Sequence, residues 1–465
     1  MTFAEATSAF ANYAWGPHML FLLVGGGLFF LLYSGFVPFR YLKHAIDIVR
    51  GKYNEPNADG YISHAGALSS AMAGTVGMGN IGGVALAIAA GGPGAIFWMW
   101  VSALVGMATK FFTCTLAIMY RGKDDTSHVQ GGPMYIVTQG LGAKWKPLAI
   151  FFAVVGLVGN APLFNGNQLV QILKEQLFQV HDSTTTSGAQ FWLELGIGIC
   201  VMLLVASVVL GGITRIAAVA TRLVPTMILL YVGCALFVLI SHLGEIPHYF
   251  AMIIEDAFSV NSIAGGLLGT MLIGVKRAAF SNEAGIGTEV MAHGSARTAD
   301  PIKEGLVAML GPAIDTLLVC TATALIILIS GVWQYSGMDG ISLSSAAFAT
   351  TIPGIGPYLL MLCVFFFSIT TIITQAFYGS QCFRFLFGSR YVNLYLYLFL
   401  GAILFAATTS LDNVVNIIDG CYALMAIPTM LSAILLAPRV KAAARDYFAR
   451  LAASKEAETE IEVES

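Results

Sequence analysis

Eleven long apolar runs constrain this chain more than any other feature of its sequence. Each run is long enough to cross about 30 Å of hydrocarbon as a helix. The runs cover residues 17–39, 65–90, 93–120, 148–173, 190–210, 213–240, 262–280, 305–332, 355–380, 391–408 and 411–437. Only 11% of the 465 residues are charged, compared with about 25% in soluble domains. The sequence therefore predicts an all-α integral membrane protein with eleven transmembrane helices.

The positions of lysine and arginine predict the orientation of these helices. Positively charged residues accumulate in the cytoplasmic loops of membrane proteins. When alternate loops are assigned to one side, every lysine and arginine except Lys110 and Lys174 lies in or next to the loops of that side. This pattern predicts a multi-pass protein of the cell (inner) membrane, with its N-terminus outside and its C-terminus in the cytoplasm.

Charge and motif spacing exclude several other classes of function. A net charge of −3 provides no positive field that would attract nucleic acid. The eight histidines show no clustered metal-ligand spacing, and the seven cysteines lie in or beside apolar runs without paired spacing. No serine occurs in a nucleophile elbow. We therefore expect a protein that is not an enzyme and has no nucleic-acid partner.

Ten of the eleven runs fit an internal duplication. Without the first run, the others divide into residues 65–240 and 262–437, and an odd number of spans in each half makes the two halves antiparallel. Both halves begin with a glycine-rich segment. In the first half it is GTVGMGNIGG at 74–83, and in the second it contains Gly265, Gly266, Gly269 and Gly274. Paired interrupted helices of this kind mark the binding site of secondary transporters. We predict one peripheral helix plus a 5+5 inverted repeat with two broken helices, within a single transmembrane domain (1–450). An acidic, disordered tail (451–465) would follow.

The segment GTVGMGNIGG is open to more than one interpretation. Gly77, Gly79 and Gly82 satisfy G-x-G-x-x-G, but a dinucleotide site also requires an acidic residue about 20 positions later. None occurs between Asp59 and Asp124. Dense glycine also allows close packing of membrane helices. We favour a broken helix, which would free N–H groups for a carboxylate and carbonyl oxygens for a cation, because packing alone does not require the polar residues among these glycines.

Several stretches resemble the signature of the alanine or glycine:cation symporter family. They are GTVGMGNIGGVALAIAAGGPGAIFWMW at 74–100, GGPMYIV at 131–137, GVKRAAFSNEAGIG at 274–287 and IDTLLVCTATALIIL at 314–328. The resemblance extends over nearly the whole chain. It implies the leucine-transporter fold, a sodium ion as the coupled ion and a small neutral amino acid as the substrate.

The resemblance also implies where the ligands bind. Backbone of the broken second span would hold the substrate carboxylate, and hydroxyls of the ninth span would share a sodium ion with carbonyls of the second. Hard oxygen ligands suit this cation. The implied substrate-binding residues are Thr75, Gly77, Met78, Gly79, Asn80, Leu163, Asn165 and Gln375. The implied sodium ligands are Ala73, Val76, Phe367, Thr370 and Thr371. Without the resemblance, the threonine hydroxyls are equally compatible with bonds back to helix carbonyls.

Three of the implied substrate positions depart from the family pattern. The family commonly has threonine at Met78, glutamine at Leu163 and tryptophan at Gln375. All three would line the amino-acid pocket, and an amide in place of an indole changes the volume and polarity of that pocket. We therefore expect the sodium side of the site to follow the family and the substrate selectivity to differ from strict alanine or glycine transport.

Three carboxylates are candidates for ion coupling or gating. Asp315 lies near the middle of the eighth run and Asp419 lies deep in the last, and intramembrane carboxylates are costly and usually functional. A structural hydrogen-bond network is the alternative for both. Glu283 would pair with Lys276, Arg277 or another inner-loop base as a brace or gate. Lys110 would extend along its span toward the inner surface.

These observations predict a monomeric symporter in the lipid bilayer that couples sodium influx to uptake of a small neutral amino acid by alternating access. One alternative is proton coupling through Asp315 or Asp419. Another is a channel or sensor that does not transport stoichiometrically. A dinucleotide-dependent enzyme is the interpretation that the sequence supports least.

Overall fold

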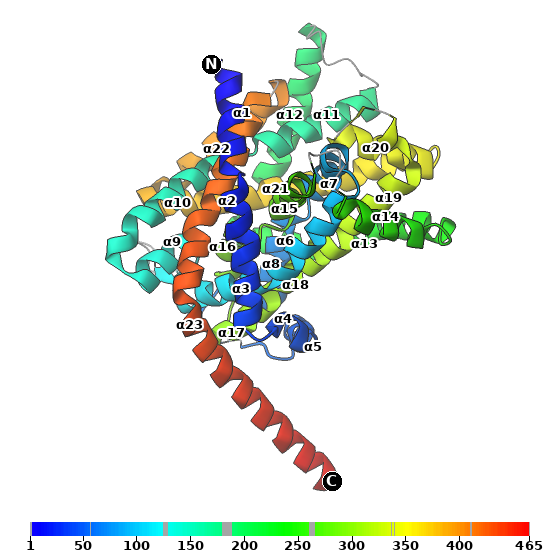
Figure 1. The fold of residues 1–465 in the computed structure, drawn as a ribbon. Helices are drawn as coiled ribbons and strands as arrows, with labels where there is room; N and C mark the ends of the chain where they lie inside the picture. Colours follow the sequence, from blue (N-terminus) through cyan, green and yellow to red (C-terminus); the bar gives the residue numbers. More distant parts are fainter. Residues whose placement is uncertain are drawn as a thin grey trace.

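The protein is a bundle of helices, shown in Figure 1 as a computed structural model. The structure describes residues 2–55, 57–123, 129–178, 188–259, 266–335, 337–338, 340–409 and 412–464. Strands within these ranges are limited to β1 (Gly122–Lys123) and β2 (Val129–Gln130), which pair antiparallel. The first helix and the first part of the last long helix lie side by side (Figure 1), so the N-terminal helix packs against the segment around Asp419 and Gly420.

The helices of the first half run to residue 257. They are α1 (Phe3–Ala14), α2 (Pro17–Leu20), η1 (Phe21–Gly25), α3 (Gly26–Tyr33), α4 (Val37–Arg40), α5 (Leu42–Val49), α6 (His64–Thr75), α7 (Met78–Gly91), α8 (Gly94–Met119), α9 (Pro133–Tyr135), η2 (Ile136–Leu141), η3 (Ala143–Trp145), α10 (Lys146–Gly159), α11 (Leu163–Phe178), α12 (Gly188–Val209), α13 (Gly212–Ser241) and α14 (Ile246–Ala257).

The helices of the second half begin at residue 267. They are α15 (Leu267–Asn282), α16 (Glu289–His293), α17 (Pro301–Ala308), α18 (Leu310–Pro312), η4 (Ala313–Cys320), α19 (Thr321–Ser330), η5 (Val332–Gln334), α20 (Gly340–Thr351), α21 (Gly356–Phe387), η6 (Ser389–Tyr391), α22 (Val392–Thr408) and α23 (Asp412–Glu464).

Nine helical segments among the described residues are long and apolar enough to cross a membrane. The bent pair α6 and α7, whose axes differ by 42°, makes a tenth if it forms one span. The first segment begins at Phe3 rather than at residue 17, because α1 continues through a bend into α2 and α3. The predicted run at 262–280 corresponds to α15, which has 16 residues and contains Lys276 and Arg277. A multi-pass membrane protein is thus confirmed, and the count of eleven spans stays a prediction.

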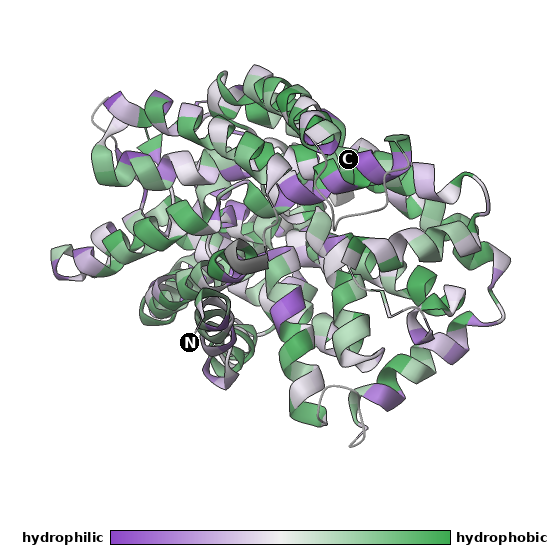
Figure 2. Cartoon of the chain, turned by 90° about the horizontal axis from the view of Figure 1, so that it is seen from above, coloured by the Kyte–Doolittle hydropathy of each residue, from purple (hydrophilic) through white to green (hydrophobic). Residues whose placement is uncertain are grey.

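The outer faces of the bundle are apolar. Leu203, Leu229 and Leu398 are 60%, 73% and 63% exposed, and Figure 2 shows hydrophobic residues along the outer helices. Apolar patches of this extent are rare on soluble monomers. The surface is therefore suited to lipid, while the polar side chains described below lie inside the bundle.

The predicted break in the second span is confirmed. Residue Val76 has ψ 94°, and Gly77 has φ −155° and ψ −148°, so the chain is extended for two residues between α6 and α7. A Cβ atom at position 77 would lie 2.5 Å from the hydroxyl oxygen of Thr371. Glycine is therefore needed here for close approach of the backbone to α21.

A second break follows α15, but it does not lie at the glycines of residues 265–274 as the sequence suggested. Gly265 lies outside the described residues, Gly266 caps the start of α15, and the others are inside that helix. The helix instead ends at Asn282, and the chain turns through residues 283–288 before α16. Both helical glycines therefore keep the helical conformation, and Gly274 allows close packing of α15 against α8.

Helix α23 continues through the predicted tail as far as Glu464, and Figure 1 shows this end projecting from the bundle. The tail is rich in alanine and glutamate, which have high helix propensity. Disorder of residues 451–465 stays a prediction, because an isolated helix of this kind is marginal in water.

Close packing of α15 on α8 gives a test of the fold. We expect Gly274→Ala to lower the free energy of unfolding by about 1–3 kcal/mol. The added Cβ would overlap the carbonyl oxygen of Ala95 and lie 2.7 Å from the Cβ of Trp98. Gly233→Ala is the matched control, since nothing lies within 4 Å of its Cβ position. Thermal unfolding of the two variants in detergent measures the difference, and equal melting temperatures for both would contradict the packing role of Gly274.

Candidate functional site

A small polar cavity lies at the break between α6 and α7. Its volume is ≈ 30 Å³, which is room for about one or two water molecules. It is lined by Gly74, Thr75, Gly77, Met78, Gly79, Gly159, Ala161, Phe164, Asn165, Phe280, Glu283, Thr371, Gln375, Ile418 and Tyr422. Six of the eight predicted substrate residues are in this lining, and Asn80 and Leu163 are not. The cavity therefore brings together residues from both halves of the chain.

The N-terminus of α7 forms one wall of the cavity. Met78 and Gly79 are its first two residues, so their N–H groups have no carbonyl partner within the helix. The Gly77 N–H donates to Oδ1 of Asn80 at 2.8 Å, and Nδ2 of Asn80 donates to Oδ1 of Asp315 at 2.6 Å. Asn80 thus caps the break from inside the protein, and Met78 and Gly79 provide the donors at the cavity.

Asp315 joins the two broken helices. It lies fully buried in the π-helical segment η4. One of its carboxylate oxygens accepts from Asn80, and the other accepts from the hydroxyls of Ser281 at 2.7 Å and Thr316 at 2.8 Å. Three donors satisfy most of the acceptor capacity of this carboxylate. The contacts are those of a structural anchor, and a coupling or gating role for Asp315 stays a prediction.

Glu283 faces the cavity from the C-terminal end of α15. It adopts the left-handed conformation, with φ 58° and ψ 10°, which is uncommon outside glycine and here ends the helix. Its two carboxylate oxygens accept from the hydroxyls of Tyr422 and Thr288, each at 2.5 Å. Both carboxylate oxygens of Glu283 are thus bound by hydroxyls, and the ammonium of Lys276 is paired elsewhere. The predicted pairing of Glu283 with Lys276 is therefore wrong.

Lys276 pairs with Asp419 of α23 instead. Its Nζ lies 3.1 Å from Oδ2 of Asp419, with 21% and 10% of the two side chains exposed. Trp15 completes the contact, because its Nε1 donates to the Asp419 carbonyl oxygen at 3.0 Å and its ring lies 5.9 Å from the ammonium. The neighbouring Ile418 lines the cavity. The ion pair thus lies beside the cavity and links α15, α23 and the N-terminal helix.

The predicted sodium ligands lie between α6 and α21, but the two threonines face different spaces. Thr371 lines the main cavity, and Thr370 lines a separate apolar space of ≈ 10 Å³ together with Ala73. Both hydroxyls donate to the carbonyl of Phe367, at 3.0 Å from Thr370 and 2.9 Å from Thr371. Val76 is fully buried at the end of α6. The bonds from threonine hydroxyls back to helix carbonyls, which were the alternative interpretation, are therefore present. They leave the lone pairs of the hydroxyl oxygens free to coordinate a cation.

The expectation that Lys110 extends to the membrane surface is wrong. Its side chain is 1% exposed, and a Cβ at Gly311 would lie 3.2 Å from its Nζ. Helix α8 is enclosed by other helices along most of its length, so no path to the surface is open. Lys110 is therefore a buried basic residue beside Gly311 of α18, a placement that its position in the sequence did not indicate.

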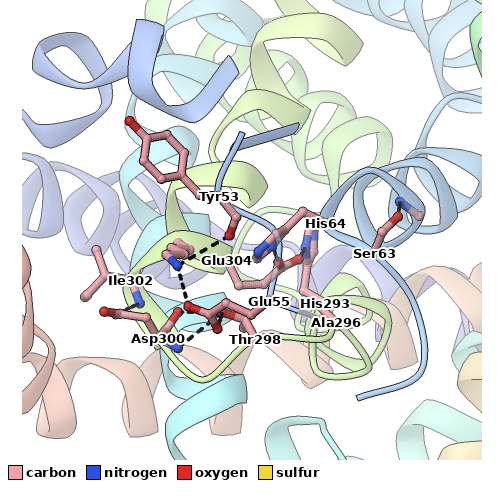
Figure 3. Close-up of polar contacts among 12 residues, drawn as sticks. Tyr53, Glu55, Ser63, His64, His293, Ala296, Thr298, Asp300, Ile302 and Glu304 are labelled. Atoms are coloured by element: carbon pink, nitrogen blue, oxygen red, sulfur yellow. Dashed lines mark hydrogen bonds and ion pairs between the residues drawn. The ribbon is translucent and has the colours of Figure 1, made fainter. Parts of the chain in front are cut away.

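A buried cluster that sequence reasoning missed ties both broken helices to α17. His64 at the start of α6 and His293 at the end of α16 place Nδ1 at 2.5 Å and 2.6 Å from the two oxygens of Glu304 (Figure 3). All three side chains are 1% exposed or less. The histidines lie 240 and 11 positions from Glu304 in sequence, so only the tertiary structure brings them together.

The loops beside this cluster are joined by further polar contacts. Glu55 pairs with Lys303 and accepts from the Ala299 N–H at 2.6 Å (Figure 3). Burial favours protonation of Glu55, but the bonds from Lys303 and Ala299 outweigh it and hold the pKa of this carboxyl below its usual value. Arg121 donates to the backbone carbonyls of Asp59, Gly294, Ala296 and Thr298. These contacts hold the segments before α6 and after α16 against each other.

Membrane-crossing helices around a polar cavity at a helix break define a membrane transporter rather than an enzyme. The chain belongs to the sodium:alanine symporter family, whose model matches residues 1–461. It is 36% identical over 443 residues to the sodium/alanine symporter AgcS of Methanococcus maripaludis, covering 94% of this chain and 95% of that protein. It is 33% identical over 446 residues to the probable sodium/glutamine symporter GlnT of Bacillus subtilis, covering 95% and 90%.

The fold is also that of a solved transporter. The crystal structure of MhsT in complex with L-phenylalanine matches with a TM-score of 0.60 and 15% sequence identity, covering 81% of this chain and 89% of MhsT. Identity this low shows the fold alone. The likeness confirms the leucine-transporter fold that the sequence motifs implied.

The cap at the break can be tested by removing Asn80. Asn80→Ala would leave the buried Gly77 N–H and one oxygen of Asp315 without their partner. We expect a loss of about 1–3 kcal/mol in unfolding free energy, the usual cost of an unsatisfied buried polar group. Asn393→Ala, at an exposed position of α22, is the control. Thermal unfolding measures both variants, and an unchanged melting temperature for Asn80→Ala would contradict the capping role.

Proposed function

We propose that this protein couples sodium influx to the uptake of a small neutral amino acid by alternating access. The observation that carries the proposal is the cavity at the α6–α7 break, with an N-terminal helix end on one wall and a C-terminal helix end on the other. Membership of the sodium:alanine symporter family supports the coupling ion. Relatives named for alanine and for glutamine support a neutral amino acid as cargo.

The two helix ends suit the two charges of an amino acid. A helix N-terminus carries partial positive charge and free N–H groups, and a helix C-terminus carries partial negative charge. We propose that the substrate α-carboxylate binds the N–H groups of Met78 and Gly79 at the start of α7. The α-ammonium group would then lie toward the end of α15, where the Glu283 carboxylate lines the cavity. Thr75 borders the same space.

Sodium would bind at the other side of the break, between α6 and α21. Its ligands would be the hydroxyls of Thr370 and Thr371 and the carbonyl oxygens of Ala73, Val76 and Phe367. The fit rests on chemistry, because neutral oxygens are the ligands that a hard cation prefers. Thr371 faces the same cavity as Met78 and Gly79. A shared wall of this kind would let the ion stabilise the backbone arrangement that binds the substrate.

The topology belongs to the same proposal. We propose eleven spans, one peripheral helix followed by a 5+5 inverted repeat of residues 65–240 and 262–437. The N-terminus would be outside and the C-terminus in the cytoplasm of the cell membrane, with the monomer as the transporting unit. The distribution of lysine and arginine supports this orientation, and the breaks after Thr75 and Asn282 support the repeat.

Reconstituted protein tests the transport reaction. We expect labelled alanine to accumulate in proteoliposomes when an inward sodium gradient is imposed, and not when potassium replaces sodium. Uptake driven equally well by a pH gradient alone would favour the proton-coupled alternative. If internal substrate does not exchange with external substrate in a counterflow assay, the protein is a channel or sensor, because only a carrier exchanges substrate across the membrane.

The sodium ligands can be tested separately from the substrate. We expect Thr371→Val, which keeps the side-chain shape and removes the hydroxyl, to raise the sodium concentration for half-maximal uptake at least about tenfold. Even the removal of a residue that only hydrogen-bonds to a metal ligand typically lowers metal affinity by about tenfold or more. Thr350→Val is the control, since this exposed hydroxyl on α20 bonds only within its own helix among the contacts described. Equal sodium dependence of the two variants would contradict the assignment.

A further inference from the structure

Two amide side chains face each other across the cavity wall formed by α11 and α21. Nδ2 of Asn165 donates to Oε1 of Gln375 at 3.2 Å. Asn165 is 6% exposed, and Gln375 is partly buried. Both residues line the same cavity as Met78, Gly79 and Glu283. The proposed binding of the substrate backbone leaves these amides without a role.

The pair leaves one hydrogen-bond donor group and one acceptor group for a ligand. A side-chain amide has two N–H donors and an oxygen with two lone pairs. The mutual bond uses one donor of Asn165 and one lone pair of Gln375. Among the contacts of the described residues, the Asn165 oxygen and the Gln375 amide nitrogen therefore keep their hydrogen-bonding capacity free. Exchanging the donor and acceptor roles of the two residues would leave the same complement, one free amide nitrogen and one free oxygen.

We propose that Asn165 and Gln375 select amino acids whose side chain carries a carboxamide, namely asparagine and glutamine, over alanine. This inference rests on the proposed function, because it assumes that the substrate backbone binds between α7 and α15. A substrate carboxamide presents an N–H donor and a C=O acceptor side by side, so it matches the free oxygen of Asn165 and the free nitrogen of Gln375. The side-chain amides of Asn165 and Gln375 and the carboxamide of the substrate would then be hydrogen-bonded to one another.

The selection against alanine follows from the groups that alanine would leave unpaired. A methyl side chain cannot bond to Asn165 or Gln375, so a buried donor and a buried acceptor would lose water and gain nothing. Sites built to hydrogen-bond a substrate group reject the analogue that lacks it more strongly than apolar pockets reject an extra methylene. An indole at position 375, as the family commonly has, would offer a single N–H donor and no acceptor.

Space for the carboxamide would come from flexible side chains in the wall. The cavity measures ≈ 30 Å³, so any amino acid requires the lining to move. Met78 is unbranched and adapts readily to irregular shapes, and Gln375 is itself a long, flexible side chain. If Gln375 changes its conformation to bond to the substrate amide, the cavity would widen where the substrate side chain lies.

Competition in proteoliposomes tests the selectivity. Sodium-driven uptake of labelled alanine is measured against rising concentrations of unlabelled alanine, asparagine and glutamine. We expect asparagine or glutamine to halve the uptake at a concentration at least about tenfold below that of alanine. Half-inhibitory concentrations for both carboxamides equal to or above that of alanine would overturn the proposal.

Variants test the two residues. Gln375→Met keeps the side-chain length and removes the amide. The ratio of the half-inhibitory concentration of alanine to that of the carboxamide amino acid should therefore fall toward one. Asn165→Leu should lower the same ratio and guards against a folding defect in the first variant. Gln171→Met makes the same exchange on α11 outside the cavity lining and should keep the wild-type ratio. A wild-type ratio in both Gln375→Met and Asn165→Leu would overturn the assignment.

Thermal stability separates this inference from the proposed function. Ligand that binds the folded state raises the melting temperature by mass action, whether or not transport follows. If no amino acid is driven by sodium but asparagine or glutamine stabilises the purified protein more than alanine, the transport proposal fails and the selectivity stands. If alanine uptake is sodium-driven and the carboxamides neither compete better nor stabilise more, only the selectivity fails.

Discussion

The interrupted backbone between α6 and α7 is the constraint on which the rest of this structure depends. Inside a membrane protein, an N–H or carbonyl group without a partner costs several kcal/mol, so irregular backbone survives only where protein or a polar cavity satisfies it. Here the Gly77 N–H is satisfied by Asn80, and Asn80 is held in turn by Asp315. The remaining donors at Met78 and Gly79 open onto the cavity. One break thus creates both a buried hydrogen-bond network and a site for a ligand.

The buried charges are arranged around the same break. Asp315 also accepts from Ser281 near the end of α15, so a single carboxylate fixes both interrupted helices. The buried side chain of Lys110 lies beside Gly311, four residues before Asp315 in the sequence. At the far ends of the broken helices, His64 and His293 share Glu304. Both broken helices are therefore tied to the same neighbours at their ends and at their centres, an arrangement suited to moving as a unit.

Much of the fold and part of the site could be predicted from local sequence. Apolar runs located the nine described helices of membrane-crossing length and the bent pair α6 and α7, because hydropathy over about 20 residues reports directly on the bilayer. Glycine density located the first break, and six of the eight predicted substrate residues line one cavity. The second break was misplaced, because a glycine inside a helix serves close packing as readily as unwinding. Gly274 lies against α8, whereas Glu283 and two later glycines form the turn.

The sequence by itself determined the class of environment, the family and the place of the first helix break. Those properties depend on composition and short-range patterns, which each residue carries with it. Only the tertiary structure decided the directions and partners of the polar side chains. Asn80 points to Asp315 rather than to the cavity lining, Lys276 pairs with Asp419, and Asn165 meets Gln375 210 positions away. Such partners are set by how helices pack, because a buried polar group must bond to whatever donor or acceptor the neighbouring helix brings within reach.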